Sequence, residues 1–185
     1  MSSLSPSAID SSWTLFLDRD GVINKRVMGD YVKRAEEFHF LPGVVDAIVR
    51  LSAVFGKVIV VTNQQGIGKG LYTHDDLAAV HALMKREVEA KGGRIDAVFY
   101  APNLASENSP LRKPGTGMAL NAQKIFPQID FAKSIMVGDT ESDMQFARNA
   151  GMHFVFCCDS GERIAADLQV ASLAQFASYI SDVKS

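Results

Sequence analysis

The chain has 185 residues, of which 47% are apolar and 22% charged, as expected of a soluble globular protein with a sizeable core. The formal net charge of -2 and the dispersed lysines and arginines give no basic field, so we expect no nucleic-acid partner. No run approaches the roughly 18 consecutive apolar residues of a membrane helix, and we expect no membrane partner either.

Residues 1–12 are polar and rich in serine, which predicts a disordered tail before a single domain over residues 13–185. This segment lacks the charged and apolar regions of a signal peptide. Cys157 and Cys158 are neighbours and form no disulfide framework, which fits a reducing compartment. We therefore expect a cytoplasmic protein, with a monomer as the default for a domain of this size.

The apolar run Leu15–Leu17 predicts a buried strand that leads directly into Asp18 and Asp20, with Gly21 behind them. Ligands of open α/β sheets bind beyond the carboxyl ends of such strands. Two carboxylates this close repel each other unless a cation, most simply a divalent metal, lies between them. Alternate side chains take opposite faces, so we expect Arg19 to point away from both acids. A polar turn is the alternative interpretation of this segment alone.

A helix is predicted over residues 42–53, with a proline at its start. The β-branched strand that follows, 57–61, ends in Thr62, Asn63 and Gln64. Hydroxyl and amide groups at a strand end are suited to holding phosphoryl oxygens.

Thr73 and Asp76 match a capping box for the next helix, which Gly92 and Gly93 terminate. Its apolar residues fall on one stripe, which is typical of packing. A strand is predicted after it, over residues 97–101.

Two cations, Arg112 and Lys113, precede a helix-like stretch over 118–125. The strand predicted at 134–137 then runs into Asp139 and Asp143, which supply the oxygen ligands that Mg²⁺ prefers.

A further strand at 153–158 and a last helix at 173–183 complete the predicted elements. Strands alternate with helices, so we expect an α/β fold with a parallel sheet covered by helices on both faces.

The order Asp-x-Asp-Gly-Val, Thr-Asn-Gln, Arg-Lys-Pro and Gly-Asp-x-x-x-Asp resembles the four motifs of the haloacid dehalogenase (HAD) superfamily of phosphatases. The match covers about residues 13–158 and implies a HAD-like, Rossmann-like fold. Four segments, 16–24, 30–32, 40–44 and 62–67, are similar to those of D,D-heptose 1,7-bisphosphate phosphatases. Histidinol-phosphate phosphatases are the nearest rival family.

Covalent catalysis divides the high barrier to hydrolysis of a phosphate monoester into two steps. Asp18 is the candidate nucleophile. Asp20 is the candidate general acid and base, a role that needs a carboxyl group whose pKa is raised by its neighbours. Thr62 and Lys113 would stabilise phosphoryl oxygens as charge redistributes. These assignments match the resemblance position by position.

The predicted metal is Mg²⁺, held by Asp18, Asp139 and the main-chain carbonyl of Asp20. Asp143 is placed in the same set, either on the metal or supporting Lys113.

For substrate binding we select Asn63 and Arg112. The resemblance implies that the arginine before the motif lysine recognises substrate, and a guanidinium suits a second phosphate. The alternatives are a solvated surface arginine at 112 and a turn-capping amide at 63.

Many relatives carry a structural zinc loop of Cys-x-His followed by Cys-x-Cys just before the Arg-Lys pair. The equivalent positions here are Ala101, Asn103, Ser109 and Leu111, so we predict no structural zinc. The loss leaves the loop shape, and hence the sugar or anomer accepted, open.

Only 44 positions separate Asp18 from Thr62 and 51 separate Thr62 from Lys113, which leaves no room for a cap domain. We expect an open site whose walls are the loops at 26–31, 64–70 and 102–111.

Taken together, these features predict a Mg²⁺-dependent phosphomonoester hydrolase that forms an aspartyl phosphate and acts on a small phosphorylated metabolite. The preferred reaction is removal of the 7-phosphate of D-glycero-D-manno-heptose 1,7-bisphosphate. Alternatives are a phosphatase of histidinol phosphate or another small metabolite, a polynucleotide 3′-phosphatase, and a non-catalytic phosphate-binding protein.

Overall fold

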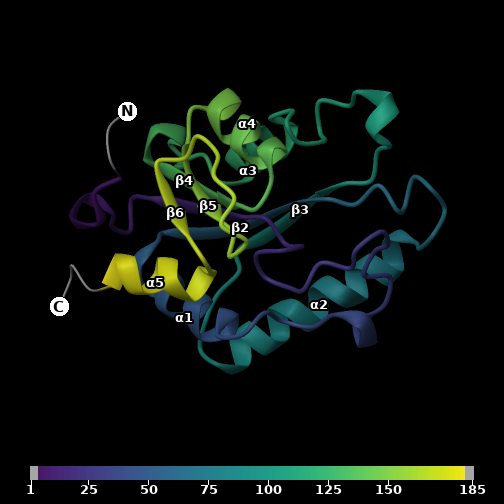
Figure 1. Ribbon diagram of the computed structural model, residues 1–185, viewed down its shortest axis with the longest axis horizontal. Coiled ribbons are helices and arrows are strands. Elements are labelled where there is room, and N and C mark those ends of the chain that lie inside the picture. Colours follow the sequence, from purple (N-terminus) through teal and green to yellow (C-terminus); the bar gives the residue numbers. More distant parts are fainter. Residues whose placement is uncertain (1–3, 182–185) are drawn as a thin grey trace.

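The computed structural model describes residues 4–181 and contains one six-stranded parallel sheet between two layers of helices (Figure 1). The strand order is β3-β2-β1-β4-β5-β6. The strands are β1 (Thr14–Leu17), β2 (Lys57–Asn63), β3 (Ala97–Ala101), β4 (Ser134–Gly138), β5 (His153–Cys157) and β6 (Leu168–Val170). The helices are α1 (Val44–Val54), α2 (His74–Ala90), α3 (Gly117–Ile125), α4 (Glu141–Ala150) and α5 (Leu173–Ser181).

Strand β1 lies at the centre of the sheet, where the direction of winding reverses. Leu15 pairs with Val58 of β2 on one side and with Ile135 of β4 on the other. The chain builds outward from β1 to β3 and then returns to place β4 beside β1. In open α/β sheets, this switch point is where ligands bind, beyond the carboxyl ends of the strands.

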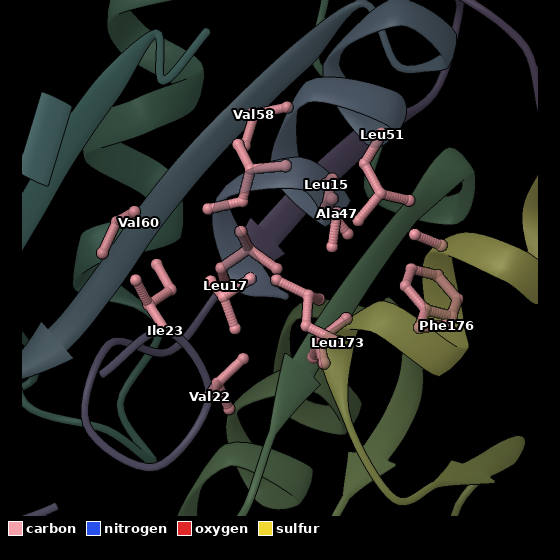
Figure 2. Packing of buried hydrophobic residues seen from close by; sticks show 14 of the residues in the cluster. Leu15, Leu17, Val22, Ile23, Ala47, Leu51, Val58, Val60, Leu173 and Phe176 are labelled. Carbon is pink, nitrogen blue, oxygen red and sulfur yellow. The ribbon is translucent and has the colours of Figure 1, made fainter. Parts of the chain in front are cut away.

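Side chains of the central strands alternate between two apolar layers. Leu15, Leu17, Val58 and Val60 pack against the layer that contains α1, α2 and α5 (Figure 2). The intervening residues, such as Phe16, face α3 and α4 on the other side of the sheet. Fully buried strands covered on both faces read as continuous apolar runs, which is why the sequence patterns locate them well.

Helix α2 begins with the predicted capping box. The Thr73 hydroxyl accepts a hydrogen bond from the Asp76 amide at 3.1 Å, and the Asp76 carboxylate accepts one from the Thr73 amide at 2.8 Å. The predicted helix at 173–183 is α5 as far as Ser181; its last two residues lie outside the described range. None of the helices within residues 4–181 has the length and apolarity needed to cross a bilayer.

The segment before β1 differs from the predicted tail. Ile9 is fully buried and Leu4 is 4% exposed, and both belong to the core layer that includes α5. The Tyr179 hydroxyl also donates a hydrogen bond to the Leu4 carbonyl at 2.7 Å. In the structure, two apolar side chains thus hold residues 4–12 against the core, whereas composition predicts a disordered tail. Residues 1–3, part of the same expectation, lie outside the described residues.

Candidate active site

Asp18 and Asp20 stand where β1 ends. The Asp18 amide donates to the Val137 carbonyl at 3.0 Å and extends the β1–β4 ladder by one residue. The chain then turns sharply at Gly21, whose φ of 95° lies in the region that favours glycine. A Cβ at this position would overlap the carboxylate of Asp139. Glycine therefore allows the loops after β1 and β4 to approach each other.

The ammonium group of Lys113 joins three parts of the site. Its Nζ donates to Asp18 Oδ1 at 2.8 Å and to the Val61 carbonyl at 2.9 Å, and it forms an ion pair with Asp143 Oδ1 at 2.6 Å. Lys113 is 4% exposed and Asp143 is fully buried. Burial alone would lower the pKa of Lys113, but the charges of Asp143 and Asp18 raise it, so the ammonium group stays protonated.

Asp143 is committed to this ion pair and to the start of α4. Its Oδ2 accepts hydrogen bonds from the amide and hydroxyl of Thr140, at 3.1 and 2.6 Å. Of the two predicted roles for Asp143, the geometry favours support of Lys113. Its carboxylate nevertheless lies in the same acidic group as Asp18 and Asp139, with ligand atoms within 4.8 Å of one another.

Burial raises the pKa of Asp18 to about 7, opposed by the attraction of Lys113 and reinforced by the charges of Asp143 and Asp139. Burial and Asp143 likewise raise the pKa of Asp139, against the attraction of Arg26. Clustered carboxylates of this kind gain stability from any further cation.

The structure corrects two expectations about Asp20. Arg19 does turn away from Asp18, but its buried guanidinium folds onto Asp20, and Nη2 donates to both carboxylate oxygens at 3.0 Å. Asn24 and Gln64 add hydrogen bonds at 2.9 Å each. Burial alone would raise the pKa of Asp20, but Arg19 and these donors together lower it. The predicted raised pKa is therefore wrong for this arrangement, because four donated hydrogen bonds favour the carboxylate.

Thr62 and Asn63 lie at the end of β2, as predicted. Thr62 is 1% exposed, and its hydroxyl accepts a hydrogen bond from Gln64 at 2.8 Å. The amide of Asn63 pairs with the main chain of Lys113, donating to its carbonyl at 3.1 Å and accepting from its N–H at 2.9 Å. Both polar ends of the Asn63 side chain thus help to position Lys113, and Asn63 also lines the cavity in which substrate binding is predicted.

One cation already bridges the oxygens at the two strand ends. Arg26 Nη2 lies 2.8 and 2.9 Å from the carboxylate oxygens of Asp139, 2.8 Å from the main-chain oxygen of Asp20 and 4.0 Å from Asp18 Oδ2. These oxygens therefore converge on one point that suits a positive charge. They include the three groups predicted to hold Mg²⁺.

Asp18, Asp20, Thr62, Arg112 and Lys113 line a polar cavity of about 190 Å³ at this edge of the sheet. No carboxylate within residues 4–181 forms an ion pair with Arg112, whose Nη1 makes only a long contact of 3.5 Å to the Asn103 carbonyl. A second cavity of about 420 Å³ shares Asp20 and Arg26 with the first and extends toward Tyr31 and Lys69.

The loop before Arg112 holds the positions at which relatives carry zinc ligands. Ala101 is buried at the end of β3, Asn103 donates to Glu107 at 2.8 Å, and the Ser109 hydroxyl accepts from the Leu111 amide at 3.3 Å. Local hydrogen bonds thus shape this loop.

Comparison with known proteins places this geometry in a family. The chain is 40% identical over 137 residues to the D-glycero-alpha-D-manno-heptose-1,7-bisphosphate 7-phosphatase of Mycobacterium bovis, a match that covers 74% of this chain and 72% of that protein. The chain belongs to the heptose-1,7-bisphosphate 7-phosphatase family. Another member, from Rhodopseudomonas palustris, is named for the beta anomer and is 38% identical over 147 residues, covering 74% of this chain and 78% of its own length.

The fold of this phosphatase family is the predicted one. The crystal structure of D,D-heptose 1,7-bisphosphate phosphatase from B. bronchiseptica, complexed with magnesium and phosphate, superposes with a TM-score of 0.83 at 30% identity. The match covers 92% of this chain and 99% of that one. A HAD-hydrolase-like family model also matches residues 110–183. The predicted HAD-like α/β fold is confirmed, and the chain is a phosphatase of the HAD superfamily.

Sequence reasoning missed Asn24 and Arg26, and it assigned Gln64 to phosphoryl oxygens, whereas the Gln64 amide donates to the Asp20 carboxylate. Asn24 and Gln64 hold the Asp20 carboxylate, and Arg26 bridges Asp20 and Asp139. Asn24 lies four residues beyond Asp20, and the sharp turn at Gly21 that brings them together gave a usable signal. Arg26 carried no such signal, since its partner Asp139 lies 113 residues away.

Proposed function

We propose that the chain removes the 7-phosphate of D-glycero-D-manno-heptose 1,7-bisphosphate through an aspartyl phosphate. The observation that carries this proposal is the position of Asp18 beside the Lys113 ammonium, in the same cavity as the Arg112 guanidinium. A nucleophilic carboxylate, a cation for the transferred phosphoryl group and a separate cation for a second phosphate fit a sugar bisphosphate.

In the first step, an oxygen of Asp18 attacks phosphorus and the bond from phosphorus to the C7 oxygen breaks. Asp20 gives a proton to that departing oxygen. In the second step, water attacks the aspartyl phosphate, Asp20 takes a proton from the water, and inorganic phosphate leaves with the Asp18 carboxylate restored. The low pKa of Asp20 is compatible with this role, because a phosphate dianion bound beside it favours protonation.

Lys113 and Thr62 are proposed to stabilise the phosphoryl oxygens. Lys113 keeps its charge by virtue of Asp143, and Asn63 fixes its main chain. The Thr62 hydroxyl accepts from Gln64, which leaves its own proton available for a phosphoryl oxygen.

The oxygens around Arg26 Nη2 fit a Mg²⁺ site, because carboxylate and carbonyl oxygens converge there on one cation-sized point. Asp18, Asp139 and the main-chain carbonyl of Asp20 would hold the ion, while Asp143 acts through Lys113. When bound, Mg²⁺ supplies charge neutralisation between the Asp18 carboxylate and the incoming phosphate. We propose that the chain holds no structural zinc, because the residues at 101, 103, 109 and 111 are neither cysteine nor histidine.

The second phosphate is assigned to Arg112, which has no carboxylate partner within residues 4–181 and opens into the cavity. A guanidinium offers paired donors that match two phosphate oxygens. The anomer accepted is a matter for measurement, since the family members compared are named for both.

The test is phosphate release with Mg²⁺, comparing kcat/KM for the two anomers of the heptose bisphosphate with histidinol phosphate. A preference for a heptose anomer of about 100-fold, equivalent to roughly 2.7 kcal/mol in transition-state binding, is expected. Arg112→Lys, which keeps the charge but loses the paired donors, is expected to raise KM for the bisphosphate more than for a monophosphate. A preference for histidinol phosphate would overturn the substrate assignment. If no phosphate were released from any of these substrates, the proposed activity itself would be overturned.

A further inference from the structure

Asp20 is held from the protein interior by a polar network that reaches helix α2. Arg19, which donates to both Asp20 oxygens, is fully buried between that carboxylate and the helix. On the helix side, Arg19 Nη1 lies 3.2 Å from Nε2 of His81, which is 8% exposed. The guanidinium thus spans the distance between a residue of α2 and the proposed general acid.

The contact with His81 requires a neutral imidazole. A guanidinium can only donate hydrogen bonds, so Nε2 of His81 must be the acceptor and carry no proton. Burial, together with the charge of Arg19, lowers the pKa of His81 to about 3, and the ring stays neutral at physiological pH. A carboxylate in this place would compete with Asp20 for the charge of Arg19, whereas a neutral ring accepts a hydrogen bond without doing so.

Arg19 has few other anchors. Its Nε atom is buried and has no hydrogen-bond partner within residues 4–181. The guanidinium is therefore located by Asp20 at one nitrogen and by His81 at another. Loss of the His81 acceptor would leave a second buried N–H group unpaired and free the guanidinium to tilt away from Asp20.

We propose that His81 is a positioning residue for this phosphatase, which fixes Arg19 and thereby aims the Asp20 carboxyl group at the departing oxygen. This inference rests on the proposed function, in which Asp20 passes a proton to that oxygen as the bond to phosphorus breaks. A parallel arm supports the other side of the carboxylate, where the Tyr72 hydroxyl donates to Gln64, which in turn donates to Asp20.

The dependence on the leaving group separates positioning from mere stability. An alkoxide, such as C7 of a sugar phosphate, needs a proton as it departs, whereas p-nitrophenolate departs without one. Single-turnover experiments with enzyme in excess follow this first step alone, before Asp20 acts on water. His81→Phe keeps a ring but has no hydrogen-bond acceptor. In this variant the rate at which the sugar is released from the heptose bisphosphate is expected to fall at least tenfold. The rate at which the same variant releases p-nitrophenolate from p-nitrophenyl phosphate should stay within twofold of the wild-type rate.

Two variants provide the controls. His81→Gln offers an amide oxygen as acceptor and is expected to recover most of the sugar-phosphate rate. Val80→Ala removes apolar contacts from the neighbouring buried position of α2, and it should lower the melting temperature without changing the ratio of the two rates. If His81→Phe does not fold, the same two rates are measured for Arg19→Lys. A lysine keeps the positive charge but cannot reach Asp20 and His81 together.

The positioning role would be overturned if His81→Phe, or its replacement Arg19→Lys, lowered the rates on both substrates equally. It would also be overturned if neither rate fell. Wild-type protein that releases product from neither substrate would instead overturn the proposed function, so the two failures are distinct.

Discussion

The guanidinium of Arg26 clamps the carboxylate of Asp139, with Nη2 2.8 and 2.9 Å from its two oxygens. The same nitrogen contacts the main-chain oxygen of Asp20, so Arg26 occupies the point where the loops after β1 and β4 meet. Its side chain is 41% exposed and comes from the loop that also lines the second cavity. An arginine and a metal ion cannot share that point.

Replacement of Arg26 is therefore expected to tighten Mg²⁺ binding. The exchange removes a half-exposed ion pair worth on the order of 1 kcal/mol, which corresponds to roughly fivefold in affinity. Calorimetric titration of Mg²⁺ into Arg26→Ala and the wild type measures the difference. Arg34→Ala serves as the control, because Arg34 lies in the same segment between β1 and α1 but does not contact Asp139. Weaker binding in Arg26→Ala would mean that Arg26 assists the metal site.

Asp18→Asn is expected to abolish turnover while leaving the fold in place. An amide lacks the nucleophilic carboxylate, and loss of a covalent nucleophile lowers kcat by roughly a thousandfold or more. The change leaves Lys113 paired with Asp143, so the melting temperature should shift by only a few degrees. Phosphate release and thermal unfolding monitored on the same preparation check both statements. Activity near that of the wild type would exclude Asp18 as the nucleophile.

Asp96 should make stability depend on acid pH. Its carboxylate accepts from the Val58 amide at 2.8 Å, from Arg94 at 2.9 Å and from Lys57 at 3.0 Å. Burial alone would raise the pKa of Asp96, but these partners hold it below the ordinary value of a carboxyl group. Because the pKa of Asp96 is lower in the folded state, its carboxylate stabilises the fold at pH values above the unfolded-state pKa. This contribution is lost as the pH falls through the folded-state pKa.

The corresponding variant is Asp96→Asn. Its free energy of unfolding is expected to be lower than that of the wild type by about 1–2 kcal/mol at pH 7. The difference should shrink as the pH falls below the ordinary carboxyl pKa of about 3.9. Urea unfolding at several pH values measures it, and a difference that persists unchanged in acid would contradict the assignment.

Truncation of Ile9 tests whether the segment before β1 belongs to the core. Ile9→Ala removes a fully buried side chain and is expected to lower the free energy of unfolding by about 2–4 kcal/mol. Ile125→Ala is the matched control, because Ile125 is 61% exposed, and it should change stability by less than about 0.5 kcal/mol. Chemical denaturation of both variants provides the comparison. Equal effects would favour the disordered tail that composition predicts.

The sequence by itself determined the α/β fold and the residues that gather at its edge. Fully buried strands are continuous apolar runs, so the central strands are visible locally. Once the strands are parallel, any polar residue that follows them lies at the same edge, and this rule alone brings together Asp18, Thr62 and Asp139. The motif lysine, Lys113, follows no strand and was predicted from its charge and from the family resemblance.

Only the tertiary structure decided how these groups are partnered. The low pKa of Asp20, the pairing of Asn63 with the Lys113 main chain and the bridge from Arg26 to Asp139 depend on contacts between distant segments. The ordering of residues 4–12 has the same origin, since Ile9 gains its apolar neighbours from the folded core. Local patterns report burial and chain direction, whereas the energy of a buried charge depends on which donors packing places around it.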